Sequence, residues 1–435
     1  MNWFPLGLTY AAMYMGRYNF NIVKSDIGAW YHLDKGQMGL IASAGFWTYG
    51  LAVAFNGPIA DRIGGRKTIL VGALGAALLN LCIGFMFLNK PGSQLLLSMS
   101  LLWSLNMYFQ SFGALSVVKV NSTWFHVQER GVFGGIFGIM ISSGYFLATT
   151  IGAWLLASFH SWTVIWFVPS AAMAGMFMVD WFLVRNRPSH AGFQDFDTGD
   201  GSNAASAEDA PLPLADLARK VFHNPIIVAL ICAEFCTGFV RQGVMLYFTE
   251  YLQEVYHLDR RTHLFWWTGI AFMAGGILGG LICGWMSDKH FQSRRPPVAF
   301  LFYLVQVLML GLLGLSLGQG SHAGQIWAVI LLGLTAMFIF GVHGMLSGTA
   351  SMDFGGRKAA ASVAGALDGI QYIGSGLTGV GLGTILKTYG WDGIATHGHQ
   401  PTNAWVWVGC IIPFSLMGAY IMTRIWTAKA NAVAH

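Results

Sequence analysis

The sequence predicts an all-α membrane protein in which twelve transmembrane helices form two pseudo-symmetric six-helix halves. Three observations support this fold class: an apolar composition, a series of long apolar runs, and a repeat of landmarks between the two halves. Of the 435 residues, 55% are hydrophobic and 10% are charged, whereas soluble chains carry about 25% charged residues. Such a chain cannot cover a globular surface with polar groups, so we expect a multi-pass protein of the lipid bilayer.

Twelve apolar runs are long enough to cross a bilayer, which takes about 20 residues. The runs are residues 4–24, 37–60, 68–88, 94–118, 132–157, 162–184, 223–253, 263–287, 297–317, 324–351, 360–386 and 402–425. The sixth and seventh runs are separated by a polar stretch rich in Asp, Gly, Ser, Ala and Pro, a composition that predicts a flexible linker. We therefore expect an N-terminal six-helix half (1–186), a cytoplasmic linker (187–222) and a C-terminal six-helix half (223–435).

The loop charges predict the orientation of the chain. With both termini in the cytoplasm, most of the Lys and Arg residues in the loops fall on the inner side, as the positive-inside rule requires. The first run carries Arg17 and no cleavage site follows it, so it should remain as a helix. The short termini predict a protein of a bacterial inner membrane, and we expect a monomer.

Several classes of function have no support in the sequence. The five cysteines lie in apolar runs without metal-binding spacing, so they predict packing rather than a disulfide or a metal site. Glycine strings such as 134–138 and 379–383 follow no strand and do not predict a nucleotide site. No catalytic triad or P-loop is present. We therefore expect no enzyme activity, no cofactor and no nucleic-acid partner.

Two arginines, Arg17 and Arg241, lie inside apolar runs, one in each half. Their spacing nearly equals that of Asp61 and Asp288, two landmarks in the loops, so they are predicted to be pseudo-symmetric mates. An intramembrane arginine is costly and stays charged, so it needs a partner or a cavity. Its planar fork binds phosphate or carboxylate through two hydrogen bonds. One fork from each half would hold a dianion between the halves, where secondary transporters bind their substrates.

A structural role for these arginines is the alternative. Arg241 lies one heptad after Glu234, on the same face of the seventh run, and the two could form an ion pair. No acidic residue lies inside the first run, so Arg17 has no such candidate partner within its own helix.

The segment GPIADRIGGRK (57–67) is similar to the loop 2–3 signature of the major facilitator superfamily, with one residue inserted at Gly64-Gly65. GWMSDKHFQSRR (284–295) echoes it in the second half. The resemblance implies the major facilitator fold and a charge cluster that latches the halves at the inner mouth; a plain positive-inside loop is the alternative. The predicted gating residues are Gly57, Asp61, Arg62, Arg66, Arg130, Asp288 and Arg357.

A closer resemblance covers nearly the whole chain. The segments that carry it are GRYNF (16–20), YFQSFG (108–113), WFHVQERG (124–131), RNRPSHAGF (185–193), VRQGVMLYFTEYLQEV (240–255) and RKAAASVAGALDGIQYIGSG (357–376). They look like the organophosphate:phosphate antiporters, which include glycerol-3-phosphate and hexose-6-phosphate exchangers. The resemblance implies that Arg17 and Arg241 are the phosphate-binding pair. The chain departs from the glycerol-3-phosphate members because Tyr18 and Val53 stand where they carry lysine, and because its fifth run has no histidine.

Other polar and aromatic residues could complete the site. Asn21 and Lys24 share a helix face with Arg17, although Lys24 also lies where a lysine could snorkel to the helix end. Acids and a histidine inside the runs could carry protons, balance the arginines or form structural hydrogen bonds. The predicted substrate-binding residues are Arg17, Arg241, Tyr14, Tyr18, Asn21, Lys24, Tyr49, Gln110, Tyr145, Gln242, Tyr247, His343, Asp368, Gln371 and Tyr372.

These observations predict a secondary active transporter. We expect alternating-access exchange of a phosphorylated or other small organic anion, with inorganic phosphate as the counter-substrate. Two alternatives stay open: a proton-coupled organic-anion symporter that uses Asp368, Glu234 or His343, and a membrane sensor of sugar phosphates that does not transport.

Overall fold

The computed structural model describes residues 2–92, 94–125, 130–195, 223–292, 294–394 and 399–428. Within helices, the side chains at 58, 61, 122, 130–137 and 348–364 lie outside this description. The predicted gating side chains of Asp61, Arg130 and Arg357 are therefore not described. Of the predicted linker, residues 187–195 are described and include the short helix η3 (Pro188–Ala191).

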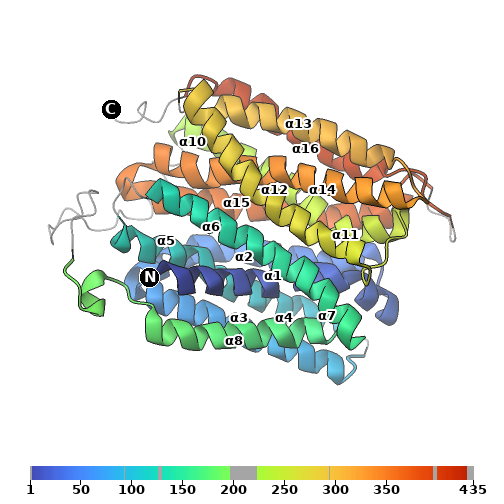
Figure 1. Ribbon diagram of the computed structural model, residues 1–435, viewed down its shortest axis with the longest axis horizontal. Coiled ribbons are helices and arrows are strands. Elements are labelled where there is room, and N and C mark those ends of the chain that lie inside the picture. The colour runs from blue at the N-terminus through green and yellow to red at the C-terminus, as the bar shows by residue number, and fades with distance from the viewer. Residues whose placement is uncertain are drawn as a thin grey trace.

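The first half of the chain forms six helical segments in sequence. They are α1 (Trp3–Tyr31), α2 (Lys35–Ile63), α3 (Gly65–Leu88), α4 (Leu95–Gln110) followed by α5 (Phe112–Trp124), α6 (Arg130–Phe146) continued by η2 (Leu147–Ile151) and α7 (Gly152–Phe159), and α8 (Val164–Leu183). Figure 1 shows these helices, coloured blue to green, gathered in one part of an elongated bundle.

The second half repeats this arrangement. Its elements are α10 (Pro225–Met245) followed by α11 (Phe248–Glu250) and η5 (Tyr251–Val255), α12 (His263–His290), α13 (Arg295–Leu315), α14 (His322–His343) continued by η6 (Gly344–Ala350), α15 (Ser351–Tyr389), and α16 (Trp405–Arg424). In Figure 1 these elements, coloured yellow to red, lie beside the first half. The predicted fold class is therefore confirmed.

Nine helices within the described residues are long and apolar enough to cross a membrane. The other three predicted runs correspond to α1, to the α4–α5 segment, and to α15. Polar residues such as Arg17, Asn21 and Lys24 lower the mean hydropathy of α1, and α4 and α5 are each too short by themselves. The elements are consistent with the twelve predicted runs.

The halves meet most closely along α2 and α15, where small residues face each other. A Cβ atom on Gly39 would lie 2.0 Å from the carbonyl oxygen of Gly379, and one on Gly50 would lie 2.7 Å from that of Gly369. The Ser43 hydroxyl donates to the Gly376 carbonyl at 2.5 Å. Small residues allow membrane helices to pack backbone to backbone.

Among the described residues, this close contact lies toward one end of the bundle. A Cβ atom on Gly57 or on Gly365, farther along α2 and α15, would meet no described atom within 4 Å. The closed end contains the turn between α1 and α2, and we call it the outer end after the orientation that the loop charges predict.

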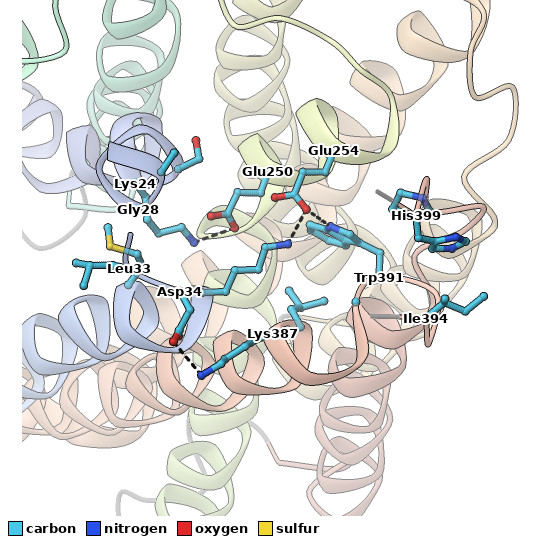
Figure 2. A pocket seen from close by; sticks show the side chains of 17 residues that line it. Lys24, Gly28, Leu33, Asp34, Glu250, Glu254, Lys387, Trp391, Ile394 and His399 are labelled. Atoms are coloured by element: carbon cyan, nitrogen blue, oxygen red, sulfur yellow. Dashed lines mark hydrogen bonds and ion pairs between the residues drawn. The ribbon is translucent and has the colours of Figure 1, made fainter. Parts of the chain in front are cut away.

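Four ion pairs join the two halves at the outer end. Lys24 of α1 pairs with Glu250 of α11 at 3.2 Å, and Lys35 of α2 pairs with Glu254 of η5 at 2.5 Å. The other two pairs are Asp34–Lys387 at 2.8 Å and Asp26–Arg260. Three of these pairs line a cavity of about 490 Å³ that opens at this end, and Figure 2 shows Lys24 directed at Glu250 and Lys387 at Asp34.

Asp34 also begins α2 by a capping box with Gln37. Burial opposes the ionisation of Asp34, but hydrogen bonds from Lys387 and from the Gln37 N–H outweigh it, so the pKa of Asp34 lies below its usual range. Asp34 therefore stays ionised, and paired with Lys387, at a pH at which a free aspartate would already be protonated. Strong acid that protonates Asp34 should weaken this contact between the halves.

At the opposite end, the described contacts of two predicted gating residues stay within one half. The Arg66 side chain donates to the Trp181 carbonyl at 2.5 Å, and its N–H donates to Asn186 at 2.7 Å. Asp288 pairs with Arg295 at 2.9 Å. Arg62 is exposed near the end of α2. The latch between the halves stays a prediction.

Replacing Gly39 by alanine should force α2 and α15 apart, because the new methyl group would overlap the Gly379 carbonyl. We expect Gly39→Ala to lower the thermal unfolding midpoint, with an overpacking cost of about 1–3 kcal/mol. Gly280→Ala is the matched control, since a Cβ atom there meets no described atom within 4 Å. Equal midpoints for the two variants would contradict tight packing at Gly39.

A zero-length carbodiimide should link the halves covalently at the outer end. It joins an amine directly to a carboxylate, so we expect Lys35–Glu254 and Asp34–Lys387 cross-links in peptides analysed by mass spectrometry. Both pairs are partly exposed, whereas Lys24 and Glu250 are 2% and 5% exposed and should react little. Glu254→Gln should remove the first link and keep the second. Finding neither link in the unsubstituted protein would argue against the closed outer end.

Candidate substrate-binding site

Arg17 lies midway along α1 and its side chain is 1% exposed. Its Nη1 donates to the Tyr372 hydroxyl at 3.1 Å, and its Nη2 donates to the backbone carbonyl of Gln110 at 3.2 Å and to Gln110 Oε1 at 3.4 Å. The guanidinium also lies 4.5 Å from the ring centre of Tyr14 and 4.7 Å from that of Tyr49. All of these partners are neutral.

Arg241 occupies the corresponding place in the second half, on α10, and is also 1% exposed. Its Nη1 donates to His343 Nε2 at 3.2 Å, and its Nη2 donates to Gln371 Oε1 at 3.0 Å. The ring centre of Tyr372 lies 5.3 Å from its guanidinium carbon. No ion pair of Arg241 is found among the described residues, so the proposed structural pair with Glu234 is not seen there.

Tyr372 brings the two arginines to one place. Its hydroxyl accepts from Arg17 of the first half, and its ring lies beside Arg241 of the second half. The same ring stacks on Tyr49 with 4.0 Å between centroids. One tyrosine of α15 therefore touches both cations, and the arginines converge on the interface between the halves.

Several buried polar atoms around the arginines lack hydrogen-bond partners among the described residues. They are the Nε atoms of Arg17 and Arg241 and the hydroxyl groups of Tyr18 and Tyr145. The two tyrosine rings lie 4.4 Å apart. A buried donor without an acceptor is unfavourable, and an anion beside either guanidinium would supply acceptor oxygens.

The remaining predicted residues near the arginines are also buried. Gln110 and Gln371 bind the guanidinium groups directly. Gln242 follows Arg241 on α10, and neither its Oε1 nor its Nε2 has a described partner. Asp368 lies one turn before Tyr372 on α15 and is half-buried.

Asn21, Lys24 and Tyr247 lie toward the outer end, where α10 stops. The Asn21 amide donates to the Met245 carbonyl at 2.9 Å, and Lys24 donates to the Leu246 carbonyl at 3.0 Å. The Tyr247 hydroxyl donates to the Gly379 carbonyl at 2.9 Å. Asn21 and Lys24 satisfy carbonyl groups that the end of α10 leaves unpaired, whereas Tyr247 joins the end of α10 to α15.

The snorkelling interpretation of Lys24 is wrong. Lys24 is 1% exposed, pairs with Glu250, and lies over the Tyr247 ring at 3.8 Å. It points into the contact between the halves and not toward a membrane surface, because the Glu250 carboxylate and the Leu246 carbonyl are available there and lipid offers no such acceptors.

Sequence reasoning missed Tyr10 and Glu250. The Tyr10 ring lies 5.9 Å from the Arg17 guanidinium and edge-on to Tyr14 at 5.1 Å. Tyr10, Tyr14 and Tyr18 recur every four residues, so the shared helix face could have identified Tyr10. Glu250 is an acid inside an apolar run, the same signal that identified Glu234.

Comparisons with known proteins agree with this geometry. The chain is 28% identical to the "Membrane sensor protein UhpC" of Salmonella typhimurium, over 89% of this chain and 85% of that protein. It is 25% identical to the glycerol-3-phosphate transporter of Bacillus subtilis, over 88% and 85% of the two chains. It is 28% identical to the hexose-6-phosphate:phosphate antiporter of Escherichia coli, over 86% and 80%. The predicted resemblance to the organophosphate:phosphate antiporters is confirmed.

Solved structures show the same fold. A bacterial homologue of the human lysosomal transporter Spinster, in an inward-facing and unoccupied conformation, aligns with a TM-score of 0.71 at 14% identity, over 97% of this chain and 94% of that one. The profile of the Major Facilitator Superfamily matches residues 6–379, which agrees with the expectation of a multi-pass membrane protein that is not an enzyme. The chain therefore belongs to the Major Facilitator Superfamily.

Proposed function

We propose that the chain is a secondary active transporter that exchanges a phosphorylated small metabolite for inorganic phosphate by alternating access. The observation that carries this proposal is the pair of buried arginines, one from each half, which meet at Tyr372 with only neutral partners. A guanidinium fork binds phosphate oxygens through two charge-assisted hydrogen bonds. Two forks provide the charge and the donors for a dianion.

The same pair supplies a mechanism for obligatory exchange. Two like charges in a low-dielectric interior repel each other, which opposes closure of the halves around an empty site. A bound dianion cancels this repulsion and bridges the halves. Reorientation is then favoured for the loaded carrier, so that one anion must enter for another to leave.

The relatives support phosphorylated substrates. One of them is named a glycerol-3-phosphate transporter, and another is named a hexose-6-phosphate:phosphate antiporter. In this proposal the chain works as a monomer in a bacterial inner membrane, and the outer end faces away from the cytoplasm. Both termini are cytoplasmic, and the segment 187–222 joins the two halves as a linker on that side.

A membrane sensor of sugar phosphates is the second candidate function. It is favoured by the similarity to the protein named a membrane sensor, which is 28% identical over 393 residues. A sensor would use the same arginines to bind its ligand without moving it across the membrane. Binding of sugar phosphates by purified protein, with no flux in vesicles under any gradient, would favour the sensor.

Exchange in proteoliposomes tests the proposed function. Vesicles loaded with phosphate should take up radiolabelled phosphate, and empty vesicles should not. Arg17→Lys and Arg241→Lys should each lower exchange tenfold or more, because each loses a charge-assisted contact of about 1.5–3 kcal/mol. The exposed Arg261 provides the matched control, and Arg261→Lys should keep wild-type exchange. Uptake into empty vesicles at the full rate would contradict exchange.

Removing the Tyr372 hydroxyl should make the empty protein less stable and more responsive to anion. Tyr372→Phe leaves Arg17 Nη1 without its acceptor, at a cost of about 1–3 kcal/mol. Phosphate would replace that acceptor, so the rise in unfolding midpoint on adding phosphate should be larger in the variant than in the wild type. A smaller rise would mean that the hydroxyl contacts the anion directly and not only Arg17.

A further inference from the structure

His343 lies between two groups that, as they are oriented in the structure, both present N–H donors to it. Arg241 Nη1 lies 3.2 Å from Nε2, and Gln371 Nε2 lies 2.6 Å from Nδ1. A neutral imidazole has one acceptor nitrogen and one N–H, so it cannot accept from both. If the imidazole proton is on Nδ1, turning the Gln371 amide would place its oxygen against Nδ1–H. The same turn would remove the oxygen that accepts from Arg241. The cluster therefore has more donors than acceptors.

Glu234 lies on the other side of the histidine. It is 0% exposed, and neither carboxyl oxygen has a hydrogen-bond partner among the described residues. Its Oε2 lies 3.8 Å from His343 Nδ1. The histidine is thus placed between a guanidinium at Nε2 and a carboxyl group near Nδ1.

The described charged and titratable groups around the pair of His343 and Glu234 come from three helices. They are Arg241 and Cys236 of α10, Tyr303 of α13 and Asp368 of α15. Arg241 is the only fixed positive charge in this described set. Arg241 does not contact Glu234 directly, but without an anion its charge favours a carboxylate at Glu234 across the imidazole ring and opposes a second positive charge on His343.

We propose that His343 and Glu234 form a proton-binding site that takes up a proton when an anion binds Arg241. The inference rests on the proposed anion site and adds a coupled ion to it. An anion bound at Arg241 accepts from the guanidinium and releases His343 Nε2. It also cancels the positive charge that balanced Glu234.

The proton balance of this step is simple. A proton from water adds to the freed lone pair on His343 Nε2. The anion also replaces Gln371 Oε1 as an acceptor for Arg241, so the turned Gln371 amide accepts from His343 Nδ1–H, and the imidazolium lies 3.8 Å from the Glu234 carboxylate. The pair changes from one net negative charge to neutral, and no covalent bond breaks in the protein. Binding of the proton and of the anion are thermodynamically linked. Protonation therefore raises the affinity for the anion by the same factor by which the anion raises the affinity for the proton.

Titration calorimetry of phosphate binding tests the coupling. Purified protein in lipid nanodiscs is titrated with phosphate near neutral pH in two buffers that differ in ionisation enthalpy. The difference in heat gives the number of protons taken up, and we expect about one per phosphate in the wild type. Because phosphate itself exchanges a proton with the buffer, the variants decide where the proton goes.

Three substitutions locate the proton. Glu234→Gln and His343→Gln should still bind phosphate through Arg17, with uptake reduced toward zero. Asp180 on α8 is the matched control, a carboxyl group that is 0% exposed and also lacks a described hydrogen-bond partner. Asp180→Asn should keep the wild-type proton uptake. Full uptake in both the Glu234 and the His343 variants would overturn the proposal.

A measurement on the unsubstituted protein guards against variants that do not fold. Infrared difference spectra, with and without phosphate, on protein carrying isotope-labelled histidine should show a label-sensitive change from imidazole to imidazolium. A spectrum without that change contradicts the proton site. If phosphate gives no heat at any pH, the anion site is contradicted, and the coupling with it. If the proton uptake is the same in the wild type and in both pair variants, only the coupling is contradicted.

Discussion

Two guanidinium groups buried inside an apolar bundle are the constraint on which the rest of the structure depends. A charge in this position must be solvated by protein groups, because lipid supplies none. Around Arg17 and Arg241 the protein supplies tyrosine rings, amide oxygens and one imidazole. These direct partners are neutral groups, so neither guanidinium has a carboxylate in contact among the described residues.

The partners of Lys24 differ from those of the two arginines. Lys24 is equally buried, yet it is paired with Glu250 and with a backbone carbonyl. The ion pair with Glu250 stabilises the charge of Lys24 and joins the halves at the outer end. A cation that is to bind a mobile anion must lack a permanent carboxylate partner, because the partner would compete with the anion. The chain therefore treats its buried cations in two different ways.

The two sites are coupled through shared helices. α1 carries both Arg17 and Lys24, α15 carries Tyr372 and the glycines that pack on α2, and α10 carries Arg241 and ends where Asn21 binds. A change of contacts at the arginines can therefore reach the outer ion pairs through the rotation of single helices. In the proposed exchange cycle, this continuity would let the two sites change together.

The sequence by itself determined the membrane fold, the repeat of the halves and the position of both arginines, because these depend on local composition and on the high cost of a charge in lipid. Helix periodicity also related Asn21 and Lys24 to Arg17. Only the tertiary structure decided that Lys24 pairs with Glu250, that Tyr372 lies between the arginines, and that His343 separates Arg241 from Glu234. These contacts join helices far apart in the chain, and periodicity within one helix carries no information about how its neighbours are rotated and packed against it.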